Sequence, residues 1–426
     1  MNICFKGIQI INPAQKLNIT TDLWLKDGII KEMSNNCHCE ENTEIINAKG
    51  LTAIPGLFDM HVHFREPGYE YKEDLKSGMN AAANGGFTGV LIMPNTKPPI
   101  HDKTVVEYIK SKTKGNLVDV YISGAITQNQ DGQHITNMLE LNENGVVLFT
   151  DDGDSVLNSE VMKRAFEYAT PMDLLISQHC EDRSLTQKFD MNESEISIKL
   201  GLRGYPSVAE EIILFRDIAL AEYCGNRRYH AQHISTKGSV ELIRNAKAKG
   251  LRVTCEVTPH HIALTDQELT SYDTNYKMNP PLRTQKDVDA LIEGLVDGTI
   301  DAIATDHAPH SKLEKDVEFD KAPNGIVGLE TSFAVCYTNL VATKKLSFER
   351  LIELMSINPR KILNLQSIEI SKDKPANLTI VDCNEEWIVD SSNFLSKSKN
   401  SPFVNKKILG KIRYTINNGK IHQSTL

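Results

Sequence analysis

A chain of 426 residues, 40% hydrophobic and 24% charged, is long enough for one large domain and a smaller one, and its composition is ordinary for a globular protein. Its net charge of -9, with no run of Lys or Arg, argues against nucleic acid as a partner. No apolar stretch approaches the roughly 20 residues that a membrane-spanning helix needs, so no membrane insertion is expected.

The first 53 residues predict short strands joined by tight turns. Apolar residues recur from Ile3 to Ile10 with the alternation of a half-buried strand. Asp27-Gly28 then separates two apolar runs, 22–26 and 29–33, and this dipeptide between strands indicates a hairpin.

The middle of the chain alternates short apolar strands with amphipathic helical stretches, which indicates a parallel α/β fold. Eight strands are expected, at Gly56–Phe64, Gly89–Asn95, Val118–Thr127, Val146–Asp152, Leu174–Glu181, Tyr229–Ser235, Val253–His261 and Asp301–Pro309. Helices are expected at Lys72–Asn84, Lys103–Lys112, Asn137–Asn144, Ser159–Ala169, Val208–Cys224, Lys237–Lys249 and Gln285–Val296. This pattern predicts a (β/α)8 TIM-like barrel. A doubly wound open sheet is the alternative, but it explains less well why polar residues end nearly every strand.

The last residues again predict strands. Ile412–Ile416 and Lys420–His422 flank Asn417-Asn418-Gly419, a second hairpin signal. The simplest arrangement is that residues 1–53 and 371–426 pair into one small β-sandwich domain, with the barrel, 54–370, inserted between its halves. Two separate sheets would leave the same pattern in the sequence.

The eight cysteines are scattered along the chain, as is typical of reduced thiols and not of a disulfide framework. The N-terminus lacks the charged-then-apolar layout of a signal peptide. We therefore expect a cytoplasmic location. Cys37-His38-Cys39 lies in a polar, acidic stretch without a second cysteine pair, and no metal is expected there.

His61-Val62-His63 ends an apolar run and leads into Arg65-Glu66-Pro67-Gly68. Alternate side chains share one face of a strand, so both imidazoles can reach the same metal ion. Arg65 lies two residues after His63 and would therefore share the same face of the strand. Its planar guanidinium is expected to point to the metal site and bind a carboxylate. A surface salt bridge with Glu66 or Glu70 is the other interpretation of Arg65.

Further polar residues stand at the ends of other predicted strands. They are Asn95, Asp151, Asp152, His179, His233 and Asp306, in addition to His61 and His63. Imidazoles and carboxylates in this number suit two adjacent borderline divalent ions such as zinc, which can hold a hydroxide between them at neutral pH. One such histidine alone is more often a core or surface residue, but the joint pattern predicts a metal centre.

The set resembles the amidohydrolase superfamily, and its local motifs resemble the class I dihydroorotase family. The matching segments are Asp59–Gly68 (DMHVHFREPG), Met93–Thr96 (MPNT), Phe149–Gly153 (FTDDG), Gln178–Glu181 (QHCE), Cys255–His261 (CEVTPHH), Lys277–Arg283 (KMNPPLR) and Ala304–His310 (ATDHAPH). The similarity runs from about residue 1 to residue 421 and implies reversible cyclisation of N-carbamoyl-L-aspartate to L-dihydroorotate, the third step of de novo pyrimidine biosynthesis.

The resemblance also implies a ligand set for two Zn2+ ions per subunit. One ion would be held by His61, His63 and Asp306, and the other by His179 and His233. Many relatives bridge the ions with a carboxylated lysine on the fourth strand, but this chain has no lysine between Asn144 and Lys163. Class I members use an aspartate there, and by its spacing to His179 we expect Asp152, with a hydroxide, to be the bridge. Asp151 is then a supporting group or a helix cap.

For the substrate, the resemblance implies Asn95 and His310 beside Arg65 at the carboxylate. Asn279 would read the ring amides, and Gly325 would offer backbone groups. Asp306 would also be the catalytic residue, taking a proton from the hydroxide and delivering it to the departing nitrogen.

Four neighbouring residues receive smaller roles. His260 and His261 are expected to hydrogen-bond to the metal ligands or to pack in the core, and not to bind a metal themselves. Cys180 is expected to be a buried thiol that points away from the site, and Asp59 to orient a ligand by hydrogen bonding.

Two alternatives remain open at this point. One is a hydantoinase, dihydropyrimidinase or allantoinase, although these relatives typically have the lysine, and Arg65 with the Lys277–Arg283 segment favours an acidic substrate. The other is a non-catalytic, dihydroorotase-like scaffold for aspartate transcarbamoylase, which should have lost metal ligands. A homodimer and an association with aspartate transcarbamoylase are left open as partners.

Overall fold

The structure, a computed structural model, describes residues 1–426 and confirms the predicted barrel. Eight parallel strands follow one another in the order β15-β14-β13-β10-β9-β8-β7-β6. The two ends of this sheet meet where the amide of His63 donates to the carbonyl of His307 at 2.9 Å, which nearly closes the barrel. The strands are β6 (Leu57–Val62), β7 (Phe87–Ile92), β8 (Asp119–Gly124), β9 (Val146–Phe149), β10 (Ile176–Gln178), β13 (Tyr229–Ala231), β14 (Val253–Val257) and β15 (Ala302–Ile303).

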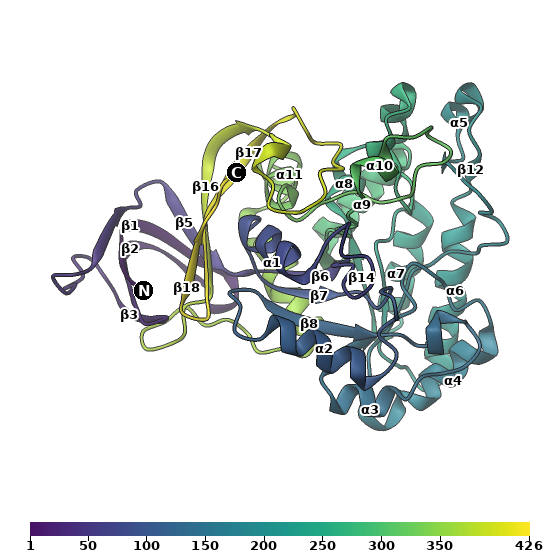
Figure 1. Ribbon diagram of the computed structural model, residues 1–426, viewed down its shortest axis with the longest axis horizontal. Helices are drawn as coiled ribbons and strands as arrows, with labels where there is room; N and C mark the ends of the chain where they lie inside the picture. The colour runs from purple at the N-terminus through teal and green to yellow at the C-terminus, as the bar shows by residue number, and fades with distance from the viewer.

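Helices surround these strands on the outside (Figure 1). The seven predicted helices are α1 (Leu75–Asn84), α2 (Lys103–Thr113), α3 (Met138–Glu143), α4 (Ser159–Tyr168), α6 (Val208–Tyr223), α7 (Lys237–Ala248) and α9 (Gln285–Asp297). Asp74, Asp102, Asn158 and Thr236 begin four of them by accepting a hydrogen bond from an amide of the first turn. Three short helices, α11 (Ser332–Cys336), α12 (Phe348–Ile352) and α13 (Asn358–Ile362), follow β15.

Shorter elements extend from the loops of the barrel. They are β11 (Met191–Asn192), α5 (Glu195–Leu200), β12 (Gly204–Tyr205), α8 (Pro259–Ala263) and α10 (Lys312–Lys315). The sequence pattern did not predict them, because two to six residues are too few to show a period. The strand expected at Val253–His261 ends at Val257, and its last residues instead begin α8, where the fixed φ of Pro259 suits the first turn of a helix. No helix is both long and apolar enough to span a bilayer.

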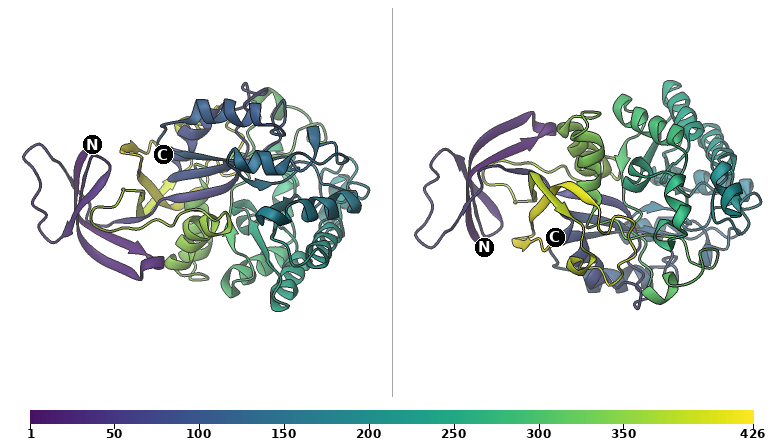
Figure 2. Two further views of the ribbon diagram at one scale, coloured as in Figure 1. Left: turned by 90° about the horizontal axis from the view of Figure 1, so that it is seen from below. Right: turned by 90° about the horizontal axis from the view of Figure 1, so that it is seen from above.

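The two chain ends meet in a second, mixed sheet with the order β18-β17-β16-β5-β1-β2-β3, in which β4 also pairs with β1. Its central pairing joins β5 to β16, where Leu378 lies opposite Pro55. Figure 2 shows its purple and yellow strands together beside the barrel. The strands are β1 (Asn2–Asn12), β2 (Leu17–Lys26), β3 (Ile29–Ser34), β4 (Glu44–Asn47), β5 (Leu51–Pro55), β16 (Leu378–Ile388), β17 (Lys407–Asn417) and β18 (Lys420–Gln423).

This second sheet confirms that the termini pair, and both predicted hairpins join consecutive strands in it. Gly56 connects it to the barrel, because β5 ends at Pro55 and β6 begins at Leu57. A Cβ at this position would lie 2.2 Å from both Asn377 Oδ1 and Thr88 Oγ1, so only glycine lets the two sheets approach so closely here.

Candidate active site

A cavity of about 540 Å³ opens beyond the carboxyl ends of the barrel strands. Only two of its 19 lining residues are hydrophobic, so it suits a small polar molecule. The sequence-predicted site residues that line it are His63, Arg65, Asn95, Asp152, His179, His233, Asn279, Asp306, His310 and Gly325. His61, the remaining one, is fully buried beneath them.

Histidine nitrogens and carboxylate oxygens converge on the floor of this cavity in two groups that could hold a metal ion. One group is His61, His63 and Asp306, and the other is His61, Asp152 and His233, with the donor atoms of each within 4.8 Å of one another. His63 Nε2 lies 2.9 Å from Asp306 Oδ1, and His61 Nε2 lies 3.3 Å from Asp152 Oδ1. His179 belongs to neither group but lies beside the second, with Nδ1 2.9 Å from His233 Nε2.

The hydrogen-bonding state of these atoms fits a bound cation. His61 Nε2 and Asp152 Oδ1 are buried and have no hydrogen-bond partner in the protein. Orphaned buried polar atoms are rare because each loses its interaction with water. A cation between them would satisfy both, and the imidazole and carboxylate donors are those that zinc and similar ions accept.

The charges within the cluster favour the anionic form of its carboxylates. Burial by itself would raise the pKa of Asp152, but the charge of His61 and the contacts with His233 and His61 hold it well below its usual range. The pKa of Asp306 is likewise depressed, against the effect of burial, by its hydrogen bond to His63 and the charge of His61. Both carboxylates are therefore ready to receive a cation at neutral pH.

The structure separates the two neighbouring aspartates clearly. Asp152 turns towards the histidines, with Oδ1 3.3 Å from His61 and Oδ2 3.5 Å from His63. Asp151 turns away and accepts hydrogen bonds from the amide, at 3.0 Å, and the hydroxyl of Thr127. Burial raises the pKa of Asp151 to about 6, against the effect of these bonds.

Arg65 reaches the opposite wall of the cavity from a turn. β6 ends at Val62, and Arg65 itself has a φ of 59°, so its direction is set by the turn and not by strand parity. Nε donates to the carbonyl of Pro309 at 3.4 Å, while the two terminal nitrogens make no hydrogen bond or ion pair. Neither Glu66 nor Glu70 pairs with it; both accept from other groups.

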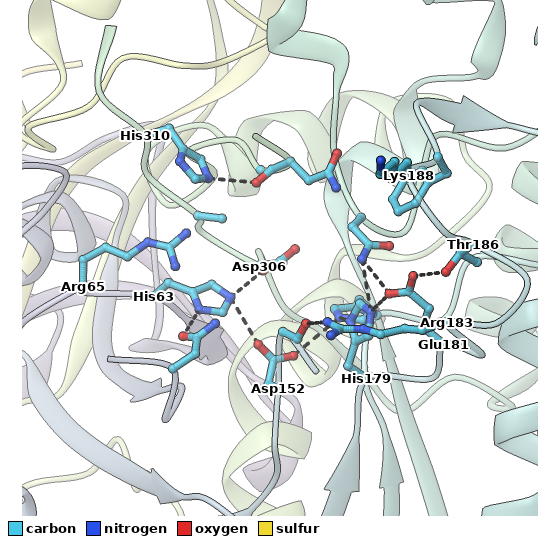
Figure 3. Close-up of a pocket in the computed structure, with 18 of the residues that line it drawn as sticks. His63, Arg65, Asp152, His179, Glu181, Arg183, Thr186, Lys188, Asp306 and His310 are labelled. Atoms are coloured by element: carbon cyan, nitrogen blue, oxygen red, sulfur yellow. Dashed lines mark hydrogen bonds and ion pairs between the residues drawn. The ribbon is translucent and has the colours of Figure 1, made fainter. Parts of the chain in front are cut away.

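The remaining predicted substrate residues are divided between the two sides of the cavity. Asn95 Oδ1 lies 2.8 Å from His63 Nδ1, and His310 Nε2 lies 2.8 Å from the carbonyl of Asn324. Asn279 Nδ2 donates to Glu181 at 2.9 Å, while its Oδ1 is buried and has no partner. Figure 3 shows His63, Arg65 and His310 on one side, His179 and Glu181 on the other, and Asp152 and Asp306 between them.

Gly325 was expected to offer backbone groups to the substrate, but the protein itself already uses these groups. Its amide already donates to the carbonyl of Lys277 at 3.0 Å, and its carbonyl accepts from Asn400. Its φ is 128°, and a Cβ there would lie 2.8 Å from the Cβ of Ala308 and 3.1 Å from His310 Nε2. Gly325 therefore contributes space in the cavity wall more than a free amide.

Comparison with known proteins agrees with this geometry. A family model described as "Dihydro-orotase-like" matches residues 50–239. A dihydroorotase of Geotalea daltonii is 49% identical over 422 residues, which cover 99% of each chain, and one of Geobacter metallireducens is 48% identical over the same length and coverage. The chain belongs to the dihydroorotase family.

Solved structures with the same fold include hydantoinases. An L-hydantoinase from Arthrobacter aurescens has a TM-score of 0.86 and 25% sequence identity, covering 100% of this chain and 96% of that one. A dihydropyrimidinase from Brevibacillus agri has a TM-score of 0.84 at 18% identity, covering 100% and 95%, and shows the fold alone. The much higher identity to the dihydroorotase family decides between these two kinds of relative.

Glu256, to which no role was assigned from the sequence, lies behind His61 and beside His230. Its Oε1 is 2.6 Å from His61 Nδ1, and Oε2 is 3.3 Å from His230 Nε2. Burial would raise the pKa of Glu256, but the charge of His61 and the contacts with His230 and His61 lower it to about 2. The carboxylate fixes the hydrogen on Nδ1 and directs His61 Nε2 to the cavity floor. In the sequence, the only indication of a role for Glu256 is its position as a carboxylate within the largely apolar strand β14.

Asp59 acts on the site through the backbone. It accepts from the amides of His61, at 3.0 Å, and Thr305, at 3.1 Å, and so ties β6 to the segment that carries Asp306. Burial raises its pKa to about 7 against these bonds.

His260 and His261 belong to neither donor group. His261 is buried between the hydroxyl of Thr258 and the carbonyl of Pro280, and the Cys180 thiol lies 3.3 Å from the hydroxyl of Tyr229. Arg283 does not face the cavity: it is 1% exposed and donates to Ser235, Asn192 and the carbonyl of Tyr205. It therefore supports the loops and does not itself favour an acidic substrate.

Proposed function

We propose that the protein is a dihydroorotase, which interconverts N-carbamoyl-L-aspartate and L-dihydroorotate in pyrimidine biosynthesis. The observation that carries the proposal is that one cavity holds both a metal-type donor cluster and the unpaired guanidinium of Arg65. The reaction needs both: an amide carbonyl must be activated, and a substrate carboxylate must be held. Ring closure joins the carbamoyl nitrogen to the side-chain carboxyl, consumes one proton and releases one water.

The donor cluster is suited to a pair of Zn2+ ions: His61, His63 and Asp306 would hold one, His179 and His233 would hold the other, and Asp152 would serve as their common carboxylate ligand. His179 and His233 offer adjacent nitrogens 2.9 Å apart, and Asp152 reaches towards both groups. When bound, such ions lower the pKa of water and polarise the substrate carbonyl.

Asp306 is the residue we assign to proton transfer. Its Oδ1 is engaged by His63 at 2.9 Å, while Oδ2 has no hydrogen-bond partner in the protein and can receive a proton. In hydrolysis it takes the proton of the attacking water at Oδ2 and delivers it to the departing ring nitrogen. In cyclisation it protonates the oxygen that leaves the side-chain carboxyl as water.

The side chains around this centre orient the substrate. The terminal nitrogens of Arg65 form a planar fork for the α-carboxylate, with Asn95 and His310 at its side. Burial, together with the charges of Arg65 and Lys72, lowers the pKa of His310 to about 2, and the neutral ring is held beside the cavity by Asn324, 2.8 Å from Nε2, and Lys72, 3.3 Å from Nδ1. Asn279 Oδ1 is the acceptor for a substrate N–H, and Gly325 leaves room for the ring.

The two alternatives are less well supported. Dihydrouracil and simple hydantoins carry no carboxylate, so they would leave the Arg65 fork unpaired. A non-catalytic scaffold would have no use for a complete buried donor set, and such sets are costly to keep without a ligand.

We propose three further points, on domain division, location and partners. Residues 1–53 and 371–426 form the small β-domain and 54–370 the barrel, and every cavity residue lies within 54–370. Eight free thiols favour a cytoplasmic location. A homodimer and an association with aspartate transcarbamoylase are compatible with the site, which one chain forms by itself.

The test is to assay the purified, zinc-loaded chain with L-dihydroorotate, dihydrouracil and hydantoin, recording the metal content. We expect turnover of dihydroorotate alone, loss of that turnover on chelation, and recovery when zinc is restored. Turnover of the uncharged rings at a similar rate would favour the hydantoinase alternative, and an inactive chain with two zinc ions bound would indicate a required partner.

Arg65→Met should weaken substrate binding while metal content stays constant. Losing a charge-assisted bond to a carboxylate costs about 1.5–3 kcal/mol, which corresponds to a rise in KM for dihydroorotate of roughly 10- to 100-fold. Arg183→Met is the matched control, because Arg183 also lines the cavity but is paired with Asp154. An unchanged KM for Arg65→Met would remove this residue from the carboxylate site.

A further inference from the structure

Glu181 is a buried carboxylate in the cavity wall to which the proposed reaction assigns no role. It follows β10 by three residues, is 3% exposed and lies beside His179 and Thr186 (Figure 3). Its Oε2 lies 2.9 Å from His179 Nε2 and 2.9 Å from Asn279 Nδ2, and its Oε1 accepts from the hydroxyl of Thr186. Since both oxygens are engaged by the protein, Glu181 is placed to orient its neighbours and not to accept a substrate proton.

The first neighbour is His179, a proposed metal ligand. An ionised carboxylate only accepts hydrogen bonds, so His179 must carry its hydrogen on Nε2. In the neutral ring that metal binding requires, Nδ1 is then left with a free lone pair, and it lies 2.9 Å from His233 Nε2, the other proposed donor to the same ion. Glu181 thus selects the ring nitrogen that faces the metal site.

The second neighbour is Asn279, a proposed substrate contact. Because Nδ2 donates to Glu181, the amide oxygen is turned away from the carboxylate, where it is buried and unpartnered. A flipped amide would place two acceptors against each other. Oδ1 is therefore the atom of this side chain without a partner in the protein. Because it is buried in the substrate-free site, the side chain must turn towards the cavity for Oδ1 to accept an N–H of the dihydroorotate ring or of the ureido group of carbamoyl aspartate.

We propose that Glu181 is a positioning residue that orients the second-metal ligand and the substrate-reading amide through the same oxygen, Oε2. One carboxylate thereby gives the metal site and the substrate site a common anchor. The proposal rests on the proposed function, because it assigns the roles of His179 and Asn279 within that reaction.

Two substitutions separate orientation from charge. In Glu181→Gln the side-chain carbonyl can take the place of Oε2, while the new NH2 donates to the hydroxyl of Thr186, so all three contacts can persist. Glu181→Asp keeps the charge but is one methylene shorter and cannot reach His179 and Asn279 together. Orientation therefore predicts that Gln is tolerated better than Asp, and a purely electrostatic role predicts the reverse.

The first readout is the affinity of the metal-free chain for Zn2+ alone, measured by competition with a chelator. We expect Glu181→Asp to weaken Zn2+ binding by about 10- to 100-fold, and Glu181→Gln to stay near the unmodified chain. The second readout is the KM for dihydroorotate at saturating Zn2+, which should rise in Glu181→Asp. Thr186→Val, which removes only the contact to Oε1, should leave both readouts unchanged.

Asn279→Ala completes the design, because it should raise KM without changing Zn2+ affinity. The combined Glu181→Asp, Asn279→Ala variant should raise KM no further than the larger single effect. Tighter Zn2+ binding by Asp than by Gln, or unchanged affinity and KM in Glu181→Asp, would overturn the proposal. Turnover of dihydrouracil and hydantoin by the unmodified chain at a rate similar to that of dihydroorotate would instead overturn the proposed function.

Discussion

Asp152→Ala is expected to remove bound zinc and activity together. Asp152 is the one carboxylate that lies within 3.7 Å of nitrogens of three of the histidines: His61 and His233 through Oδ1, and His63 through Oδ2. Its loss takes away a carboxylate that contacts histidines of both donor groups and leaves the buried Nε2 of His61 without its nearest carboxylate. Zinc content by elemental analysis should fall well below two per chain, and dihydroorotate turnover should fall to background.

Asp151→Ala is the matched control for this prediction, since it removes an adjacent buried carboxylate that turns away from the cluster. It leaves the amide of Thr127 unpaired and should cost about 1–3 kcal/mol of unfolding free energy, with zinc content unchanged. If Asp151→Ala lost zinc and Asp152→Ala stayed metallated and active, the bridge would belong to Asp151.

The barrel was predictable because each strand is a short apolar run that ends in polar or turn residues. All eight predicted strands occur, but several are shorter than expected: Asp301–Pro309 was predicted, and β15 spans Ala302–Ile303. The residues that follow β15 are equally buried, yet Asp306 has a φ of 48°, which ends regular strand geometry. Burial gives such segments the composition of a strand, so their sequence cannot show where pairing stops.

The candidate site was predictable to the extent that its residues stand in short motifs. His61, His63, Asp152 and Asp306 were found in this way, and their convergence follows from the shared carboxyl edge of the strands. The contact between His61 and Glu256 joins residues 195 positions apart, and no local pattern reports it. The hydrogen bonds of Gly325 and the burial of Arg283 also depend on contacts between residues far apart in the sequence. The sequence alone therefore could not show that the Gly325 amide is occupied or that Arg283 faces away from the cavity.

Asp306→Asn should slow the chemistry strongly while retaining zinc. The substitution keeps the shape of the side chain, and an amide oxygen can still lie beside His63 Nε2 as a donor to the metal site, but the amide cannot take or deliver a proton at the position of Oδ2. Removing a general acid and base should lower kcat by about 10²- to 10⁴-fold. Because the equilibrium constant of the overall reaction is fixed, kcat/KM must fall by the same factor for hydrolysis and for cyclisation.

The measurement is therefore made in both directions, with elemental analysis of zinc in each sample and Asp151→Asn as an isosteric control. A loss of kcat of about 10²- to 10⁴-fold at full zinc content would assign the proton transfer to Asp306, and equal losses of kcat/KM in the two directions would show that the two assays are consistent. Loss of zinc in step with activity would show that Asp306 acts chiefly as a ligand. The separation is feasible because the two oxygens differ in the structure: Oδ1 contacts His63 at 2.9 Å, and Oδ2 is unpartnered. The amide can replace the first oxygen and not the second, so this one substitution separates metal binding from proton transfer.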